Sequence, residues 1–147
     1  MAAVDKRLAC VDVVNVSRQL SELMSVRLAA FGVSIGQLPA LLALYERDGR
    51  TQAELARAVG VEQPTMAATL RRMERDGLIR RIPDPGDRRR ARVQLTDRAL
   101  AMRDELQTQR AAIDELALAG LSARERHTLQ HMLATITANL VAAARDS

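Results

Sequence analysis

Residues 51–96 place two short helical patterns directly before two short strand patterns. Thr51 and Glu54 have the spacing of a capping box, which predicts a helix that begins at the residue after Thr51. Gly60 is expected to end this helix, because the turn that follows needs a residue that tolerates a positive φ angle. A second helix is expected to begin near Pro64, where the missing N–H of proline costs nothing. This order predicts a helix-turn-helix motif followed by a β-hairpin wing.

The second helix of this segment has two contrasting faces. Met66, Leu70 and Met73 recur at helical spacing and predict a buried stripe. The rest of the helix surface has short side chains near its start and arginines near its end. This profile suits a helix in the major groove of DNA, where short side chains approach base edges and arginines approach phosphates. A solvated face decorated with arginines is the alternative. The residues expected to contact DNA are Gln63, Pro64, Thr65, Ala68, Thr69, Arg71, Arg72 and Arg75.

The predicted hairpin has strand patterns at residues 78–82 and 91–95 and an arginine-rich connection between them. Residues 83–90 contain two prolines and one glycine, which predict a loop, and end in three successive arginines. Arginine suits the negative potential of a narrow minor groove. We expect Asp87 to accept a bidentate hydrogen bond from Arg89 and to hold it extended. A solvated hairpin tip is the alternative. The wing residues expected at the DNA are Asp87, Arg88, Arg89 and Arg90.

The positive charge of the chain is concentrated in this region. Residues 71–92 contain nine Arg and four Asp or Glu, a net charge of +5, whereas the formal net charge of the whole chain is +4. A local basic surface of this kind is the electrostatic footprint expected of a nucleic-acid-binding protein. Lys6 is the only lysine, and arginine favours bidentate contacts with phosphate and guanine. A winged-helix module that binds an acidic protein surface through the same arginines remains the alternative function.

The sequence resembles the MarR family of bacterial transcription regulators, the multiple-antibiotic-resistance type. The resemblance follows nearly the whole chain and is most specific at the motif D-x-R followed by L-T, here residues 87–89 and 95–96. Residues 63–79, QPTMAATLRRMERDGLI, resemble the recognition helix of the family and its exit. The resemblance implies a homodimeric winged-helix repressor on a palindromic operator. It further implies that the recognition helix enters the major groove, that Arg89 enters the minor groove and that Asp87 supports Arg89.

The resemblance also implies release by a small effector, often aromatic or phenolic, that binds between the dimerisation layer and the winged segment. Release requires that the effector favour a dimer whose recognition helices are wrongly spaced for DNA. No cluster of charged residues in the sequence marks such a pocket, so no effector-binding residue is predicted.

The flanking segments predict long helices with more apolar residues than one small core needs. We therefore expect one MarR-like domain, mainly α-helical, in which a helical layer pairs two chains. Such a two-fold dimer would set two recognition helices about 34 Å apart, one turn of B-DNA. A monomer with a larger core is the alternative. The helices are expected over residues 5–31, 34–49, 97–119 and 123–144; the domain of residues 1–147 comprises a winged core, 34–96, and a helical dimerisation region, 1–33 and 97–147.

Cys10 is a candidate redox residue on the first predicted helix. Its position resembles the peroxide-sensing branch of the same family, in which oxidation of such a cysteine releases the dimer from DNA. Those sensors have tyrosines four and fourteen residues after the cysteine, where this chain has Val14 and Met24. Without these partners, nothing obvious activates the thiol. We therefore favour a buried structural cysteine over a sensor.

Other kinds of chemistry have little support in the sequence. His127 and His131 have a spacing that suits a shared metal, but both lie opposite the apolar stripe of their helix and no third ligand accompanies them. Catalytic motifs are absent, so we expect no enzyme, metal site or cofactor. No apolar run approaches the length of a membrane span. The single cysteine and the absence of a signal pattern favour the cytoplasm.

Overall fold

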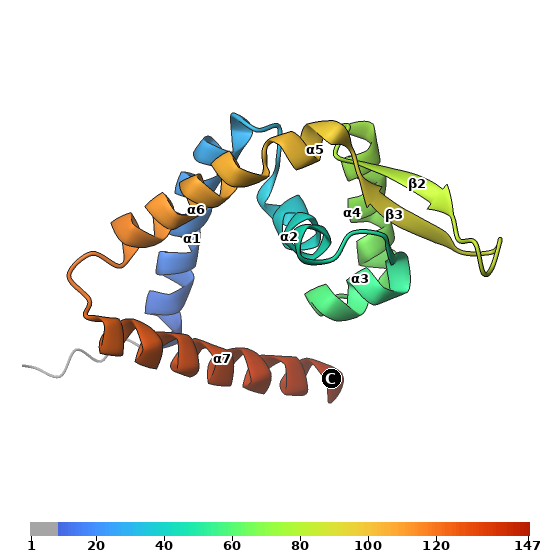
Figure 1. Ribbon diagram of the computed structural model, residues 1–147. Helices are drawn as coiled ribbons and strands as arrows, with labels where there is room; N and C mark the ends of the chain where they lie inside the picture. Colours follow the sequence, from blue (N-terminus) through green and yellow to red (C-terminus); the bar gives the residue numbers. More distant parts are fainter. Residues whose placement is uncertain (1–8) are drawn as a thin grey trace, which may run out of the picture. The chain divides into compact units, whose positions relative to one another are not determined.

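The computed structural model describes residues 9–147, which divide into two compact units. The first unit ends at Arg110 and the second comprises Ala111–Ser147. The predicted winged core, residues 34–96, lies within the first unit. Along the chain the elements are α1 (Ala9–Ala29), the 3-10 turn η1 (Ile35–Gln37), α2 (Leu38–Glu46), β1 (Arg50–Thr51), α3 (Gln52–Val59), α4 (Gln63–Arg75), β2 (Ile79–Pro83), β3 (Ala91–Leu95), α5 (Asp97–Ala101), α6 (Arg103–Ala117) and α7 (Ala123–Arg145) (Figure 1).

The β-sheet of the first unit has three strands in the order β1-β3-β2, and both pairings are antiparallel. Ile79 pairs with Leu95 and Pro83 with Ala91, so β2 and β3 form the predicted hairpin. The hairpin projects to one side of α3 and α4 (Figure 1). The sequence did not predict β1, because a strand of two residues is too short to show an alternating pattern. The expected mainly helical winged helix-turn-helix fold is confirmed.

The core of the first unit is aliphatic and includes the predicted stripe of α4. Met66, Leu70 and Met73 are each at most 1% exposed. They pack with Leu55 of α3 and Val93 of β3 in a single cluster of buried residues. Burial of one large aliphatic side chain contributes about 1.5–3 kcal/mol to folding. The stripe therefore fixes the rotation of α4 about its axis and turns the opposite face outward.

Two predicted helices are divided in the structure. In place of the predicted helix over residues 34–49, the structure has η1 and α2, and α2 ends at Glu46, before the predicted end. Pro39 lies in the first turn of α2, where its missing N–H costs no hydrogen bond. The predicted helix over residues 97–119 is divided between α5 and α6 at Met102. For the predicted helix over residues 5–31, α1 accounts for Ala9–Ala29, and residues 5–8 lie outside the described residues.

Polar contacts tie the C-terminal end of α4 to the rest of the first unit. The buried Gln37 donates a hydrogen bond from Nε2 to Oδ2 of Asp76 at 2.7 Å. Arg98 donates from Nη1 to the carbonyl oxygen of Asp76 at 3.0 Å and from Nη2 to the carbonyl oxygen of Phe31 at 2.9 Å. The hydrogen bond from Gln37, assisted by Arg75, holds the pKa of the Asp76 carboxyl below its ordinary value. Asp76 is therefore an anchor for α4 in its ionised form.

The lowered pKa of Asp76 predicts a specific pH dependence of stability. A carboxyl whose pKa is lower in the folded state stabilises the fold above its unfolded-state pKa, and this contribution is lost as the pH falls through the folded-state pKa. We expect Asp76→Asn to unfold at lower urea concentration than the parent at about pH 7. We expect the difference to shrink as the pH approaches about 3. A difference in urea midpoint that is the same at both pH values would contradict the assignment.

In the second unit, α7 begins at the predicted capping box. Ser122 Oγ accepts a hydrogen bond from the Glu125 N–H, and Glu125 Oε1 accepts one from the Ser122 N–H, each at 3.1 Å. Arg126 connects α7 to the preceding helix through Glu115, 2.6 Å from its Nη1. No residue of α7 is buried, and its predicted apolar stripe includes five exposed large side chains: Met132, Leu133, Ile136, Leu140 and Val141.

Candidate nucleic-acid interface

The N-terminal half of α4 presents the predicted base-reading residues on its outer face. Thr65 is exposed, and Ala68 and Thr69 are half-buried. The Thr69 hydroxyl donates to the Thr65 carbonyl oxygen at 3.1 Å, so one of the two hydroxyls is occupied within the helix. The short side chains leave the backbone of α4 open to close approach. The other exposed predicted residues of this helix are Gln63, Pro64, Arg71, Arg72 and Arg75.

Toward its C-terminus, α4 becomes cationic, as predicted, but its last arginine is already paired. The Nε of Arg75 lies 3.1 Å from Oδ1 of Asp76. Because this pair is exposed, it contributes little to stability and leaves Arg75 able to exchange partners. The positive charge at this end of the helix is therefore partly offset by the carboxylate of Asp76.

The tip of the wing is shaped by Asp87 in a way that differs from the prediction. Asp87 Oδ1 accepts a hydrogen bond from the backbone N–H of Arg89 at 2.9 Å, and Oδ2 lies 3.8 Å from Nε of Arg90. The contact with Arg89 thus involves its backbone instead of the expected bidentate guanidinium. Aspartate often closes a turn through a backbone N–H two residues later. Asp87 therefore sets the turn, and Arg88, Arg89 and Arg90 are all exposed.

A groove of about 560 Å³ separates α3 from the wing. Gln63 of α4 lines this groove together with Arg89 and Arg90, which are far from Gln63 in the sequence. Arg57 and Arg81 also line this groove, although neither was predicted as a site residue from the sequence. Arginine is a residue type expected at a DNA-binding surface, but only the folded hairpin shows that these two arginines line the same groove as Arg89. The other lining residues are Thr51, Gln52, Ala53, Glu54 and Ala91.

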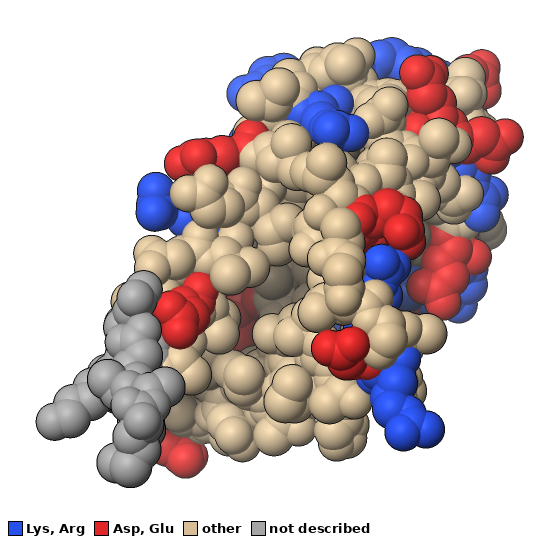
Figure 2. All heavy atoms as spheres, turned by 90° about the vertical axis from the view of Figure 1, so that its left-hand side faces the viewer, with Lys and Arg blue, Asp and Glu red and all other residues tan. Residues whose placement is uncertain are grey.

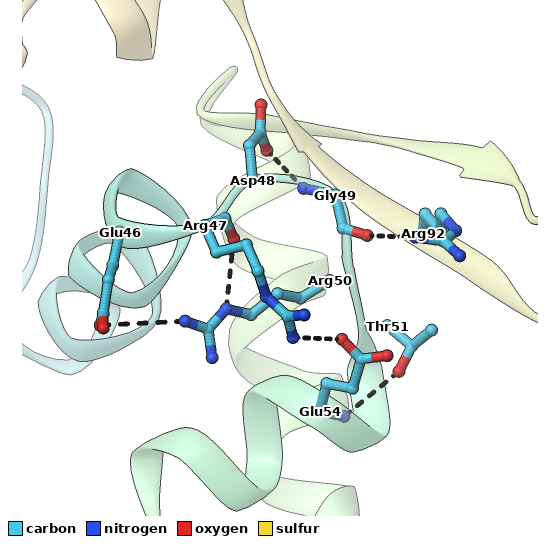
Figure 3. Close-up of polar contacts among 8 residues, drawn as sticks. All are labelled: Glu46, Arg47, Asp48, Gly49, Arg50, Thr51, Glu54 and Arg92. Carbon is cyan, nitrogen blue, oxygen red and sulfur yellow. Dashed lines mark hydrogen bonds and ion pairs between the residues drawn. The ribbon is translucent and has the colours of Figure 1, made fainter.

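The base of the wing is held by the turn between α2 and α3 (Figure 3). Asp48 Oδ1 accepts hydrogen bonds from the N–H groups of Gly49 and Leu95, both at 2.9 Å. Gly49 has a φ of +76°, which favours glycine, and its N–H also donates to the carbonyl oxygen of Val93 at 3.1 Å. Arg92 returns a bond from Nη1 to the Gly49 carbonyl oxygen at 3.2 Å. This short segment therefore secures the central strand β3.

The predicted capping box of α3 is formed only in part (Figure 3). Thr51 Oγ1 accepts a hydrogen bond from the Glu54 N–H at 3.2 Å, as expected. The Glu54 carboxylate instead pairs with Nη2 of Arg47 at 2.9 Å. This ion pair takes the place of the hydrogen bond that a full capping box would form between the Glu54 carboxylate and the Thr51 N–H. Because Arg47 directly follows α2, the pair also links α2 to α3.

Asp84 is a buried acid within the wing loop and was not predicted as a site residue from the sequence. Its residue is 9% exposed, and its Oδ1 accepts a hydrogen bond from the Gly86 N–H at 2.9 Å. The same oxygen lies 3.6 Å from Nε of Arg92. The hydrogen bond from Gly86, together with the charge of Arg92, holds the pKa of the Asp84 carboxyl below its ordinary value. The Asp-x-Gly spacing was the available sequence signal for this turn.

The remaining candidate site residues, Cys10, His127 and His131, lie outside the winged segment in the sequence. Cys10 is exposed near the start of α1, so the expected buried structural cysteine is wrong for the isolated chain. His127 and His131 are exposed on α7. Within residues 9–147, no group of three or more His, Cys, Asp or Glu side chains is arranged to hold a metal. None of the helices in this range has both the length and the apolar character needed to cross a membrane.

The chain is similar to known regulators over this same region. A sequence model of the MarR family matches residues 31–90, from just after α1 to the end of the wing loop. NicR from Pseudomonas putida, an HTH-type transcriptional repressor, is 35% identical over 97 residues. The segment that the model matches belongs to the MarR family. The NicR alignment covers 66% of this chain and 61% of NicR, so less than two thirds of that repressor is matched.

Solved structures of MarR-family proteins share the fold. PcaV from Streptomyces coelicolor, in complex with its natural ligand, has a TM-score of 0.73 and 26% identity, with 93% of this chain and 97% of PcaV covered. A mutant MarR from E. coli, complexed with operator DNA, has a TM-score of 0.76 and 22% identity, with 84% and 89% covered. NicR and PcaV are both transcription regulators.

Proposed function

We propose that this MarR-family protein is a homodimeric transcription repressor that binds a palindromic operator. In this proposal α4 enters the major groove and Arg89 of the wing enters the adjacent minor groove. The observation that carries the proposal is the groove in which Gln63 of α4 and the wing residues Arg89 and Arg90 meet. The short side chains on the outer face of α4 suit contacts with base edges, and the arginines of the neighbouring wing loop suit contacts with phosphates.

A homodimer is supported by apolar side chains that each unit leaves exposed. In the first unit α1 exposes Val11, Val14 and Val26, and in the second unit α7 exposes the stripe described above. Uncharged residues predominate on the face drawn in Figure 2. Large exposed apolar surfaces are typical of protein–protein interfaces. Pairing through these helices would present two copies of α4 to two half-sites of a palindrome.

Control by a small molecule is part of the proposal. PcaV forms a complex with its natural ligand, and this chain shares its fold at 26% identity. We infer that a small aromatic or phenolic effector lowers operator affinity by favouring a dimer in which the two copies of α4 are wrongly spaced. Peroxide sensing through Cys10 is not proposed, because Val14 and Met24 occupy the two positions where the sensing branch of the family has tyrosines.

The salt dependence of binding tests this function. We expect the purified protein to protect one palindromic site in its own upstream DNA in footprinting. We expect log K for that site to fall linearly with log salt, at a slope of about 0.9 per neutralised phosphate. A scrambled duplex of equal length should bind more weakly at every salt concentration. Weak binding to both duplexes with no sequence preference would instead support the alternative, a module that binds an acidic protein surface.

A further inference from the structure

We propose that Asp84 and Arg92 are positioning residues of the wing, whose ion pair sets the direction of the loop that carries Arg88, Arg89 and Arg90. This inference rests on the proposed function, since it assigns these residues a role in operator affinity. It does not require either side chain to contact DNA. It differs from the assignment of Asp87, whose contacts stay within the tip of the loop.

Asp84 organises the first half of the loop. Its Oδ1 accepts the Gly86 N–H at 2.9 Å, which closes a turn directly after β2. Its backbone N–H donates to the Arg90 carbonyl oxygen at 3.1 Å, so the two ends of the loop are joined across the hairpin. Its side chain is only 11% exposed, whereas the Asp87 side chain is 46% exposed. Asp84 is therefore built into the loop and is not a solvated acid at its tip.

Arg92 connects that turn to the rigid part of the first unit. It lies on β3, the central strand, where its Cα pairs with Ile82 on one side and Thr51 on the other. Its Nε lies 3.6 Å from Asp84 Oδ1, and its Nη1 donates to the Gly49 carbonyl oxygen at 3.2 Å. One guanidinium thus reaches both the wing loop and the turn between α2 and α3. Figure 3 shows the second of these contacts.

The negative charge of Asp84 allows a positioning role to be distinguished from a direct electrostatic effect on DNA binding. An acidic side chain in a loop that approaches DNA is repelled by the phosphates, so its removal should by charge alone strengthen binding. If Asp84 instead holds the loop through Arg92, its removal should weaken binding, because the arginines at the tip would lose their fixed direction. The two explanations therefore predict opposite changes in the same measurement.

The test compares operator affinity by fluorescence anisotropy for the full chain and five variants. We expect Asp84→Ala to bind about five- to tenfold more weakly than the parent, with Asp84→Asn intermediate because its amide oxygen still accepts the Gly86 N–H. Arg92→Gln should weaken binding, and adding it to Asp84→Ala should cause little further loss, since the two residues act as one unit. Asp97→Ala, which removes an exposed acid at the start of α5, is the matched charge control and should not weaken binding.

Circular dichroism and thermal unfolding establish that each variant is folded, and Asp84→Asn replaces Asp84→Ala if the latter is not. Parent-like or tighter binding by the Asp84 variant would overturn the inference while leaving the proposed function intact. Additive losses, with Arg92→Gln lowering the salt slope by about 0.9, would overturn it in favour of a direct phosphate contact by Arg92. A parent protein without operator-specific binding would overturn the proposed function, and this inference with it.

Discussion

Replacing Leu140 with glutamate is expected to convert the proposed dimer to monomers and to lower operator affinity at least about 100-fold. Leu140 lies on the apolar stripe of α7 and is 65% exposed in the single chain, so the change should disturb the protomer itself little. In a dimer the same carboxylate would lose water without gaining a partner, which costs several kcal/mol. A monomer binds one half-site and loses the gain in effective concentration that two linked sites provide.

Size-exclusion chromatography with light scattering at micromolar concentration measures the first effect, and anisotropy on the same samples measures the second. Ala138→Glu is the matched control, because it adds the same charge two residues away, on the opposite side of α7. It should remain dimeric and bind like the parent. A dimeric Leu140→Glu protein with parent-like affinity would show that the stripe of α7 is not an interface. A monomeric parent would contradict the dimer itself.

Arg89→Ala is expected to weaken operator binding about 10- to 100-fold, or about 1–3 kcal/mol, without a measurable change in thermal stability. Arg89 is exposed at the tip of the wing, and Asp87 contacts its backbone N–H, which an alanine retains. The loop should therefore keep its shape while it loses one guanidinium. Loss of a minor-groove contact should also reduce the preference for the operator over a scrambled duplex.

Arg124→Ala provides the control for the loss of one exposed positive charge, because Arg124 lies on α7 in the second unit. Arg124 is not among the residues proposed to contact the operator, so its replacement should have a small effect on affinity at about 0.15 M salt, where general charge attraction is largely screened. If Arg89→Ala and Arg124→Ala weaken binding equally, the effect of Arg89 is general charge and the proposed role of the wing is wrong.

Much of the first unit follows from local patterns in the chain. The stripe of Met66, Leu70 and Met73 repeats at the period of a helix, which predicted both α4 and its outward face. The alternation in residues 91–95 matches β3 as observed. In the second unit, the cap at Ser122 was also predictable, because capping depends on residues only three positions apart. These features need no knowledge of the rest of the fold.

Contacts between distant residues were not predictable in the same way. The bond from Gln37 to Asp76 spans 39 positions and the bond from Arg92 to Gly49 spans 43. An ion pair between Asp87 and the Arg89 guanidinium was expected from the charges of the two side chains. In the folded turn, the Asp87 carboxylate instead accepts a hydrogen bond from the backbone N–H of Arg89. Asp84 was overlooked because its importance comes from burial by the hairpin, which no pattern in residues 83–90 indicates.

The chain by itself determined the helical faces, the hairpin, the arginine-rich loop and the resemblance to the MarR family, because periodicity, turn residues and short motifs act over a few positions. Only the tertiary structure decided which arginines share the groove with Gln63, how β1 completes the sheet, and how Arg92 joins the wing to the turn at Gly49. The physical reason is that these contacts form between segments brought together by burial of the aliphatic core, and a hydrogen bond across 40 or so positions leaves no periodic trace in a sequence.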